Sequence, residues 1–196
     1  MSKDMELLVD KIKIDVKNTL TPKRYEHVIN VMETALLLNK TNIPKWKIEI
    51  SALLHDFQKE LSDSELIKIC KRENFPELKN IENWLPILHG FVAYLYAKNI
   101  LEIKDNNILN SIKYHSIGRT KMSELEKIIY LSDNIEPTRK YLGVEAIRNI
   151  AKNDIECALL LLLKTKIDYL SSQKKEGNIH PNTFLMKKWL LEEQKE

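Results

Sequence analysis

Apolar residues recur every three or four positions along most of the chain. Val28, Val31, Met32, Ala35 and Leu36 show this spacing, which places them on one face of an α-helix. We find no convincing run in which apolar and polar residues alternate, as they do in a half-buried strand. The pattern therefore predicts a helical protein, with helices near residues 4–19, 22–40, 45–55, 63–73, 85–99, 106–115, 123–134, 144–151, 154–174 and 182–193.

Signals for helix starts fall at several of these boundaries. Thr21-Pro22 has the form of an N-cap residue followed by a first-turn proline. Ser62 and Glu65, and again Ser123 and Glu126, have the spacing of a capping box, in which each side chain binds the other residue's backbone N–H. The chain also contains few helix breakers, with four glycines and six prolines. We expect an all-α protein.

The composition is that of a single globular domain. Of the 196 residues, 43% are hydrophobic and 30% are charged, a balance typical of folded rather than disordered chains. We find no Ser/Gly/Pro-rich linker, and we predict one domain over residues 1–196, with a core at about 20–140 and C-terminal helices at 144–193 packed on it. A net charge of +3 is too small to indicate nucleic acid or a membrane as partner.

The chain start and the cysteines indicate a cellular compartment. The first residues, MSKDMELLVD, are charged and have no signal-peptide core. Cys70 and Cys157 lie far apart and in no paired motif. We therefore expect a soluble cytoplasmic protein in a reducing environment, with both thiols serving as small apolar fillers.

Four histidines and one aspartate lie beside apolar helix faces, namely His27, His55, His89, His115 and Asp133. One histidine in such a place is usually a hydrogen-bonded core residue, and one aspartate usually caps a helix end. A helical core that repeatedly admits these residue types must satisfy them together. Imidazole and carboxylate groups suit zinc, iron, manganese or cobalt, and ligands on separate helices can converge in a bundle.

Longer strings around these residues resemble the YqeK-type branch of the HD superfamily of metal-dependent phosphohydrolases. They are RYEHV, ALLHDFQKE, ILHG, YHSIGRTKMSELEKIIYLSDNIEPTR and IHPNT, and the resemblance spans about residues 20–190. It implies a single HD-domain helical bundle with N- and C-terminal flanking helices. It also implies metal-dependent hydrolysis of diadenosine tetraphosphate, or other dinucleoside polyphosphates, symmetrically to two ADP by attack of metal-bound water on a phosphoanhydride.

The resemblance also implies a set of ligands for one divalent transition metal. Its motif positions match His27, His55, Asp56 and Asp133. Iron is the first expectation for the metal, with cobalt, manganese and zinc as alternatives. Asp56 would bind the metal and orient the attacking water.

The remaining predicted site residues are expected to contact the substrate. His89 and His115 resemble the phosphate-contacting pair of the branch and are expected to be catalytic together with Asp56; which histidine would protonate the leaving group stays open. One departure from the usual pattern, Phe57-Gln58, leaves the proposed ligands and Lys59 in place. The full predicted substrate-binding set is Lys59, His89, His115, Ser116, Arg139, Gly177, Asn178, Ile179, His180 and Pro181.

Two other functions stay open on the residues alone. The four proposed ligands together with His89 and His115 also resemble the six-ligand set of di-iron HD oxygenases. A non-catalytic helical module that binds a nucleotide or a metal is the third alternative. For the leading function we expect a small nucleotide substrate with an ADP or GDP-like product, and no nucleic-acid or membrane partner. A homodimer is compatible with the sequence, which determines neither the oligomeric state nor the base preference.

Overall fold

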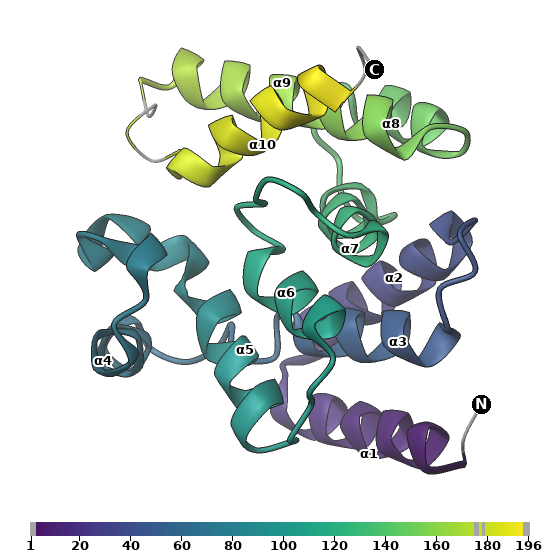
Figure 1. Cartoon of the computed structure of the whole chain (residues 1–196), viewed down its shortest axis with the longest axis vertical. Coiled ribbons are helices and arrows are strands. Elements are labelled where there is room, and N and C mark those ends of the chain that lie inside the picture. Colours follow the sequence, from purple (N-terminus) through teal and green to yellow (C-terminus); the bar gives the residue numbers. More distant parts are fainter. Residues whose placement is uncertain (1–2, 175–176, 178, 194–196) are drawn as a thin grey trace.

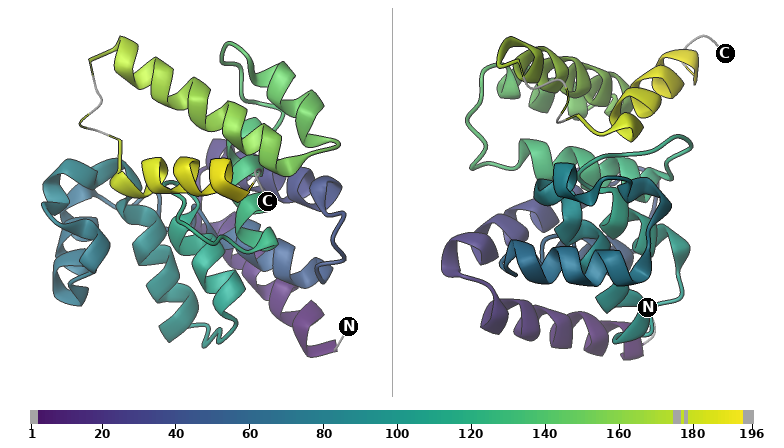
Figure 2. Two further views of the ribbon diagram at one scale, coloured as in Figure 1. Left: turned by 45° about the horizontal axis from the view of Figure 1, so that its top comes forward. Right: turned by 90° about the vertical axis from the view of Figure 1, so that its left-hand side faces the viewer.

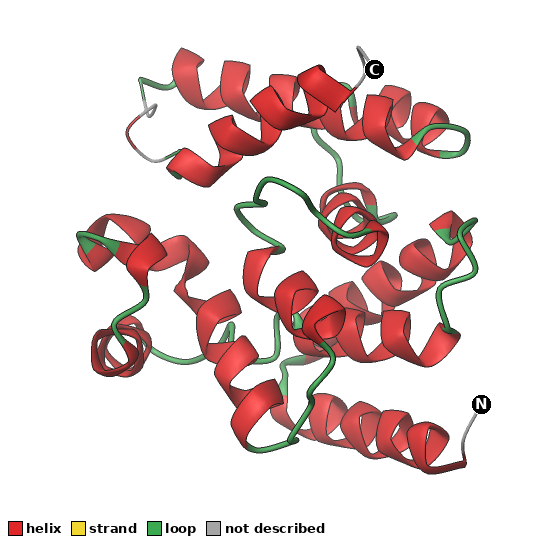
Figure 3. Ribbon diagram, viewed as in Figure 1, coloured by secondary structure: helices red, strands yellow, loops and turns green. Residues whose placement is uncertain are grey.

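Helices make up the regular structure of the protein. The computed structural model describes residues 3–174, 177 and 179–193, and no strand occurs within those ranges (Figures 1 and 3). The α-helices are α1 (Lys3–Thr19), α2 (Pro22–Leu38), α3 (Lys45–Leu54), α4 (Asp63–Glu73), α5 (Leu88–Asn99), α6 (Asn106–Tyr114), α7 (Glu124–Ile135), α8 (Val144–Ala151), α9 (Ile155–Ser172) and α10 (Pro181–Glu193). Two 3-10 helices, η1 (Pro76–Leu78) and η2 (Ile81–Ile87), connect α4 to α5. The predicted all-α fold is confirmed.

The predicted helix boundaries agree with the structure to within two residues, except before α5. The sequence pattern predicted one helix over 85–99, but the α-helix begins at Leu88 and η2 precedes it. Trp84 leaves the helical region, with φ −116° and ψ 17°, and Pro86 lies inside η2. The ring of Pro86 disfavours α-helical backbone angles at the residue before it, Leu85, so the α-helix starts only after this position.

The helix-start signals are borne out in two places and modified in a third. Ser62 and Ser123 form capping boxes with the glutamates three residues later. Thr21 occupies the N-cap position of α2, before a first-turn proline, but its side chain makes no cap to that helix. The Thr21 hydroxyl and backbone N–H instead bind the carboxylate of Glu60. The start of α2 therefore has no side-chain cap.

The helices pack around α7. Helix α2 contacts α3 and α7, and α6 contacts α3, α5 and α7. On one side of α7, α8, α9 and α10 form a layer, which Figure 2 shows from two directions. Helix α4 and η2 pack on α5, on the side of α5 that faces away from α6 (Figure 1). This packing brings the ends of α3 and α6, the start of α5 and the middle of α2 to one place beside α7.

Buried apolar residues form two clusters. The larger one follows the packing around α7 and includes fully buried Ile128 and Tyr130. The smaller one lies between α4, η2 and α5, where Cys70 is buried as predicted. The same prediction for Cys157 was wrong, because this residue lies in the first turn of α9 on an exposed face. In the described part of the chain, no helix is both long enough and apolar enough to cross a membrane.

Candidate metal and phosphate site

Six buried or largely buried side chains from five helices or helix ends meet in one cluster. His55 is completely buried, His89 and His115 are each 2% exposed, and Asp56 is 4% exposed. Imidazole and carboxylate groups removed from water must be satisfied by each other or by a bound group. We call this set, formed by His27, His55, Asp56, His89, His115 and Asp133, the His/Asp cluster.

Two of the histidines are oriented by the helix ends on which they lie. His55 is the C-cap residue of α3, and its Nδ1 lies 2.6 Å from the Ala52 carbonyl oxygen. His115 is the C-cap residue of α6, and its Nδ1 lies 2.8 Å from the Ile112 carbonyl oxygen. A carbonyl can only accept a hydrogen bond, so Nδ1 carries the proton in both rings. The Nε2 atoms therefore face the cluster with lone pairs that can accept a hydrogen bond or bind a metal.

The four predicted metal ligands face one another. His27 Nε2 lies 3.1 Å from Asp133 Oδ1 and 3.6 Å from Asp56 Oδ2. His55 Nε2 lies 3.8 Å from Asp56 Oδ2 and 3.9 Å from Asp133 Oδ1. Both Nε2 atoms are buried and make no hydrogen bond within the protein. Two unsatisfied imidazole nitrogens facing two carboxylates fit a divalent transition metal.

Asp56 belongs to two triads of possible ligands. The first triad is His27, His55 and Asp56, and the second triad is Asp56, His89 and His115. His89 Nε2 lies 3.0 Å from Asp56 Oδ1, and His115 Nε2 lies 3.6 Å from the same oxygen. The two Nε2 atoms are 3.0 Å apart. Asp56 therefore directs Oδ2 toward His27 and His55 and Oδ1 toward the other two histidines. Either triad has donor atoms close enough together to surround a cation.

The protonation states of two histidines and both carboxylates of the cluster suit metal binding. Burial lowers the pKa of His55 and of His89 to about 4 in each case, so both rings are neutral near pH 7. Burial alone would raise the pKa of Asp133, but the close contact with His27 and the positive charge of Arg139 lower it below its ordinary value. The pKa of Asp56 is also lowered, because the surrounding histidines outweigh the effect of burial. Neutral imidazoles and ionised carboxylates are the ligand forms that metals bind.

Two arginines neutralise the carboxylates of the cluster. Arg24 Nη1 lies 2.7 Å from Asp56 Oδ2, and Arg139 Nη2 lies 2.7 Å from Asp133 Oδ1. Arg139 was predicted from the sequence, whereas Arg24 was not. Arg24 lies three residues before His27, on the same face of α2. That three-residue spacing from a predicted ligand is the feature of the sequence that could have indicated Arg24.

Glu136 is a second residue that the sequence analysis missed. Its side chain is fully buried, and Oε1 lies 3.2 Å from His27 Nδ1. Thr138 holds the same carboxylate through its hydroxyl, at 2.5 Å, and its backbone N–H, at 2.7 Å. A carboxylate that accepts from Nδ1–H leaves Nε2 of the histidine free for a metal. Its position three residues after Asp133 could have indicated this role.

Arg148 of α8 anchors the segment that carries Glu136 and Arg139. Its guanidinium donates to the carbonyl oxygens of Ile135, Glu136 and Arg139, at 2.7, 2.6 and 2.9 Å. These carbonyls follow the end of α7 and would otherwise lack partners. Helix α8 thus helps to hold the shape of the site.

We expect Glu136→Gln to lower metal affinity by about 10- to 100-fold, because the amide cannot replace the charged acceptor at His27 Nδ1. The measurement is competition for the metal against a chelator of known affinity. Glu33→Gln, which changes an exposed residue on the same helix as His27, is the matched control. Equal metal affinity in the two variants would contradict the positioning role of Glu136.

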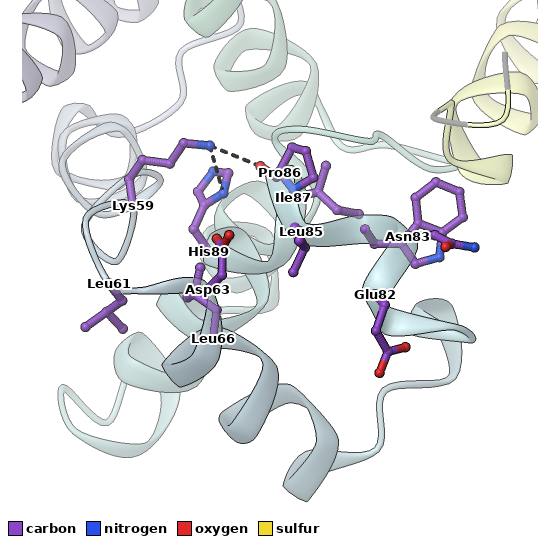
Figure 4. Close-up of a pocket in the computed structure, with 11 residues that line it drawn as sticks. Lys59, Leu61, Asp63, Leu66, Glu82, Asn83, Leu85, Pro86, Ile87 and His89 are labelled. Atoms are coloured by element: carbon purple, nitrogen blue, oxygen red, sulfur yellow. Dashed lines mark hydrogen bonds between the residues drawn. The ribbon is translucent and has the colours of Figure 1, made fainter. Parts of the chain in front are cut away.

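A pocket opens next to the second triad. It has a volume of about 460 Å³ and is lined by Lys59, Leu66, Trp84, Leu85, Pro86 and His89, among others. Figure 4 shows Lys59 reaching across His89 toward the Pro86 carbonyl. Lys59 Nζ lies 3.1 Å from His89 Nδ1 and donates to it, so the ring proton of neutral His89 lies on Nε2. We call this space the Lys59 pocket.

The other predicted substrate-binding residues lie at two places. Ser116 Oγ is 2.9 Å from His115 Nε2, at the edge of the cluster. Ile179, His180 and Pro181 lie at the start of α10, where the His180 ring packs against Trp84 with centroids 4.8 Å apart.

His180 is already engaged within the protein. Its Nε2 donates to the Glu77 carbonyl oxygen at 2.9 Å, and its Nδ1 accepts from the Asn182 N–H at 3.2 Å. Gly177 is exposed, and Asn178 lies outside the described residues. The segment at 179–181 therefore packs against Trp84, a lining residue of the Lys59 pocket, and is not part of the His/Asp cluster.

Comparison with known proteins identifies the family. A model of the HD domain family matches residues 24–138. The chain belongs to the HD family. Symmetrical bis(5'-nucleosyl)-tetraphosphatases of Bacillus subtilis and Halalkalibacterium halodurans are 36% and 38% identical to this HD protein. Those alignments cover 90% and 92% of this chain, and 94% and 95% of the respective relatives.

A solved structure agrees with this assignment. A protein from Clostridium acetobutylicum, described as a predicted HD superfamily hydrolase involved in NAD metabolism, superposes with a TM-score of 0.85. It is 37% identical, and the match covers 94% of this chain and 97% of that one. The resemblance to symmetrical tetraphosphatases of the HD superfamily is thus confirmed. These relatives favour neither the di-iron oxygenase nor the non-catalytic module.

Proposed function

We propose that this HD protein hydrolyses diadenosine tetraphosphate symmetrically to two ADP, using a divalent metal in the His/Asp cluster. The observation that carries the proposal is the pair of buried, unpartnered imidazole nitrogens on His27 and His55, which face two carboxylates. Symmetrical tetraphosphatases that match over almost the whole chain support the choice of reaction and substrate.

We assign the metal to His27, His55, Asp56 and Asp133, with iron expected first and cobalt, manganese or zinc as alternatives. A divalent metal supplies Lewis acidity toward a phosphoryl oxygen and lowers the pKa of bound water. Asp56 also belongs to the second triad, and its Oδ1, which faces His89, can accept a hydrogen bond from a water and orient it. The buried setting strengthens these electrostatic interactions relative to those in bulk water.

The remaining polar residues of the site bind the polyphosphate. Lys59 and Arg139 bring positive charge to either side of the cluster, and the guanidinium can contact two phosphate oxygens at once. His89 carries its ring proton on Nε2, on the side of the cluster, and we assign this N–H to a phosphate oxygen of the bound substrate. His115 and Ser116 complete this side of the site.

We place one nucleoside of the substrate in the Lys59 pocket. Its apolar walls, including Leu66, Leu85 and Trp84, suit a base, and Lys59 and His89 lie where the attached phosphates would enter. The segment at 179–181 contributes by supporting Trp84, through the packing of His180.

The direct test of the proposed reaction is product analysis. The purified protein is supplied in turn with iron, cobalt, manganese and zinc and incubated with diadenosine tetraphosphate, and the nucleotides are separated by chromatography. We expect ADP as the only nucleotide product, at two per substrate. ATP and AMP as products, or no hydrolysis with any of the metals, would contradict the proposal.

Arg139→Gln is expected to weaken ADP binding about tenfold, the effect of losing about 1.4 kcal/mol of charge-assisted hydrogen bonding. Calorimetric titration with ADP measures the effect, and metal content is determined on the same samples. Lys140→Gln changes the exposed neighbour and is the control. An affinity for ADP equal to that of the control would remove Arg139 from the phosphate-binding set.

A further inference from the structure

A second pocket opens on the other side of Asp56 from the Lys59 pocket. It has a volume of about 410 Å³, and its lining includes Thr21, Lys23, Arg24, His27, Thr138 and Arg139. We call it the Arg24 pocket. The sequence predicted two of its lining residues, His27 and Arg139, but not the pocket. Its volume is close to the 460 Å³ of the Lys59 pocket.

Lining residues of both pockets contact Asp56. Oδ1 of this carboxylate faces His89, which lines the Lys59 pocket, at 3.0 Å. Oδ2 contacts Arg24 at 2.7 Å and faces His27 at 3.6 Å, and both of these residues line the Arg24 pocket. A chain of phosphates that passes over the His/Asp cluster can therefore extend into a pocket at each end.

The lining of the Arg24 pocket differs from that of the Lys59 pocket. It contains three cationic side chains, from Lys23, Arg24 and Arg139, and no large apolar side chain. It also contains three acidic residues, but two of these already have partners within the protein. Glu136 is fully buried against His27 and Thr138, and Glu60 accepts hydrogen bonds from Thr21.

The cationic groups of this pocket are available to an anion. Arg24 and Arg139 are 32% and 38% exposed, and each contacts a carboxylate that we assign as a metal ligand. A divalent cation at those carboxylates would neutralise them, which leaves both guanidinium groups with donors to offer. The start of α2 adds backbone N–H groups without a side-chain cap, at the positive end of the helix dipole.

We propose that the Arg24 pocket binds the diphosphate of the second nucleotide half of the substrate. This inference rests on the proposed function, because it assigns a place to the half that the Lys59 pocket does not hold. One ADP unit lies on each side of Asp56, and the linkage between the two central phosphates lies over the cluster. The arrangement accounts for cleavage into two equal products.

Lys23→Glu tests the subsite without altering a cluster residue. Lys23 is exposed in the first turn of α2. An acidic side chain at this end of a helix interacts favourably with the helix dipole, so we expect the variant to fold. The control is Lys164→Glu, which makes the same charge change on an exposed residue of α9 outside both pockets.

Two measurements are made on the metal-loaded protein. Calorimetry with ADP should give two ADP bound per chain in the wild type and in Lys164→Glu. In Lys23→Glu one of them should weaken by about tenfold or more. The KM for diadenosine tetraphosphate should rise by a similar factor in Lys23→Glu alone.

The outcomes separate the subsite from the proposed reaction. If Lys23→Glu and Lys164→Glu agree in both ADP binding and KM, the subsite is overturned even though the reaction stands. If two ADP bind and Lys23→Glu weakens one of them, the subsite is supported even where the wild type releases no ADP from diadenosine tetraphosphate. In that second case the proposed function fails instead.

Discussion

Asp56→Asn is expected to lose bound metal and to lower turnover of diadenosine tetraphosphate by about a thousandfold or more. Its two oxygens face both triads of the His/Asp cluster, at distances between 3.0 and 3.8 Å from the histidine nitrogens. The amide of asparagine offers one neutral oxygen in place of two that share a negative charge. Loss of several kcal/mol of transition-state stabilisation corresponds to a rate loss of this size, at about 1.4 kcal/mol per factor of ten.

Metal analysis and steady-state kinetics on the purified variant measure both effects. Asp10→Asn is the matched control, because it makes the same change on an exposed residue of α1. A thermal unfolding curve shows whether the variant is folded at the assay temperature. If folded Asp56→Asn keeps full metal content, the assignment of Asp56 as a ligand is wrong.

His89→Gln and His115→Gln are expected to keep about one metal per chain while turnover falls by about 100-fold or more. We assign His89 to the phosphates because Lys59 donates to its Nδ1 and thereby places the ring proton on Nε2, toward the cluster. We assign His115 with it because its Nε2 already lies within hydrogen-bonding distance of His89 Nε2 and Ser116 Oγ, at 3.0 and 2.9 Å. A protonated nitrogen donates a hydrogen bond and cannot ligate a metal. The geometry of the second triad would also allow a second ion, so metal stoichiometry decides between the two arrangements.

The same measurements on His27→Gln and Asp133→Asn give the contrast. These variants should lose the metal, since we assign both residues as metal ligands and their donor atoms lie 3.1 Å apart. A wild-type content near two metals per chain, falling to one when His89 or His115 is replaced, would contradict the one-metal assignment. It would favour the dinuclear alternative and, with it, the oxygenase function.

The sequence predicted most helices because their start signals are local. The two capping boxes at Ser62 and Ser123 need only residues three positions apart, and the structure contains both. The start of α5 was missed because Pro86 disfavours an α-helical backbone at Leu85 while the apolar spacing continues through it. Thr21 carried a correct N-cap signal, but its side chain binds Glu60, a partner 39 residues away that no local pattern reveals.

The sequence predicted the ligand residues of the candidate site better than it predicted the residues that hydrogen-bond to them. His27, His55, Asp56 and Asp133 stand out because histidine and aspartate are unusual beside apolar helix faces. Their partners do not stand out, since Arg24 and Glu136 look like ordinary surface residues in a chain with 30% charged positions. Only the packing of α2 against α3 and α7 shows that Arg24 reaches Asp56 and that Glu136 reaches His27.

The most direct test of the account is reconstitution of the chelated protein with metal. Metal is returned in steps to protein stripped by a chelator, and bound metal and ADP release from diadenosine tetraphosphate are measured at each step. We predict that ADP release rises in proportion to bound metal, levels off at one metal per chain, and yields no ATP or AMP. Full hydrolysis by the stripped protein, or activity that appears only as a second metal binds, would contradict the account.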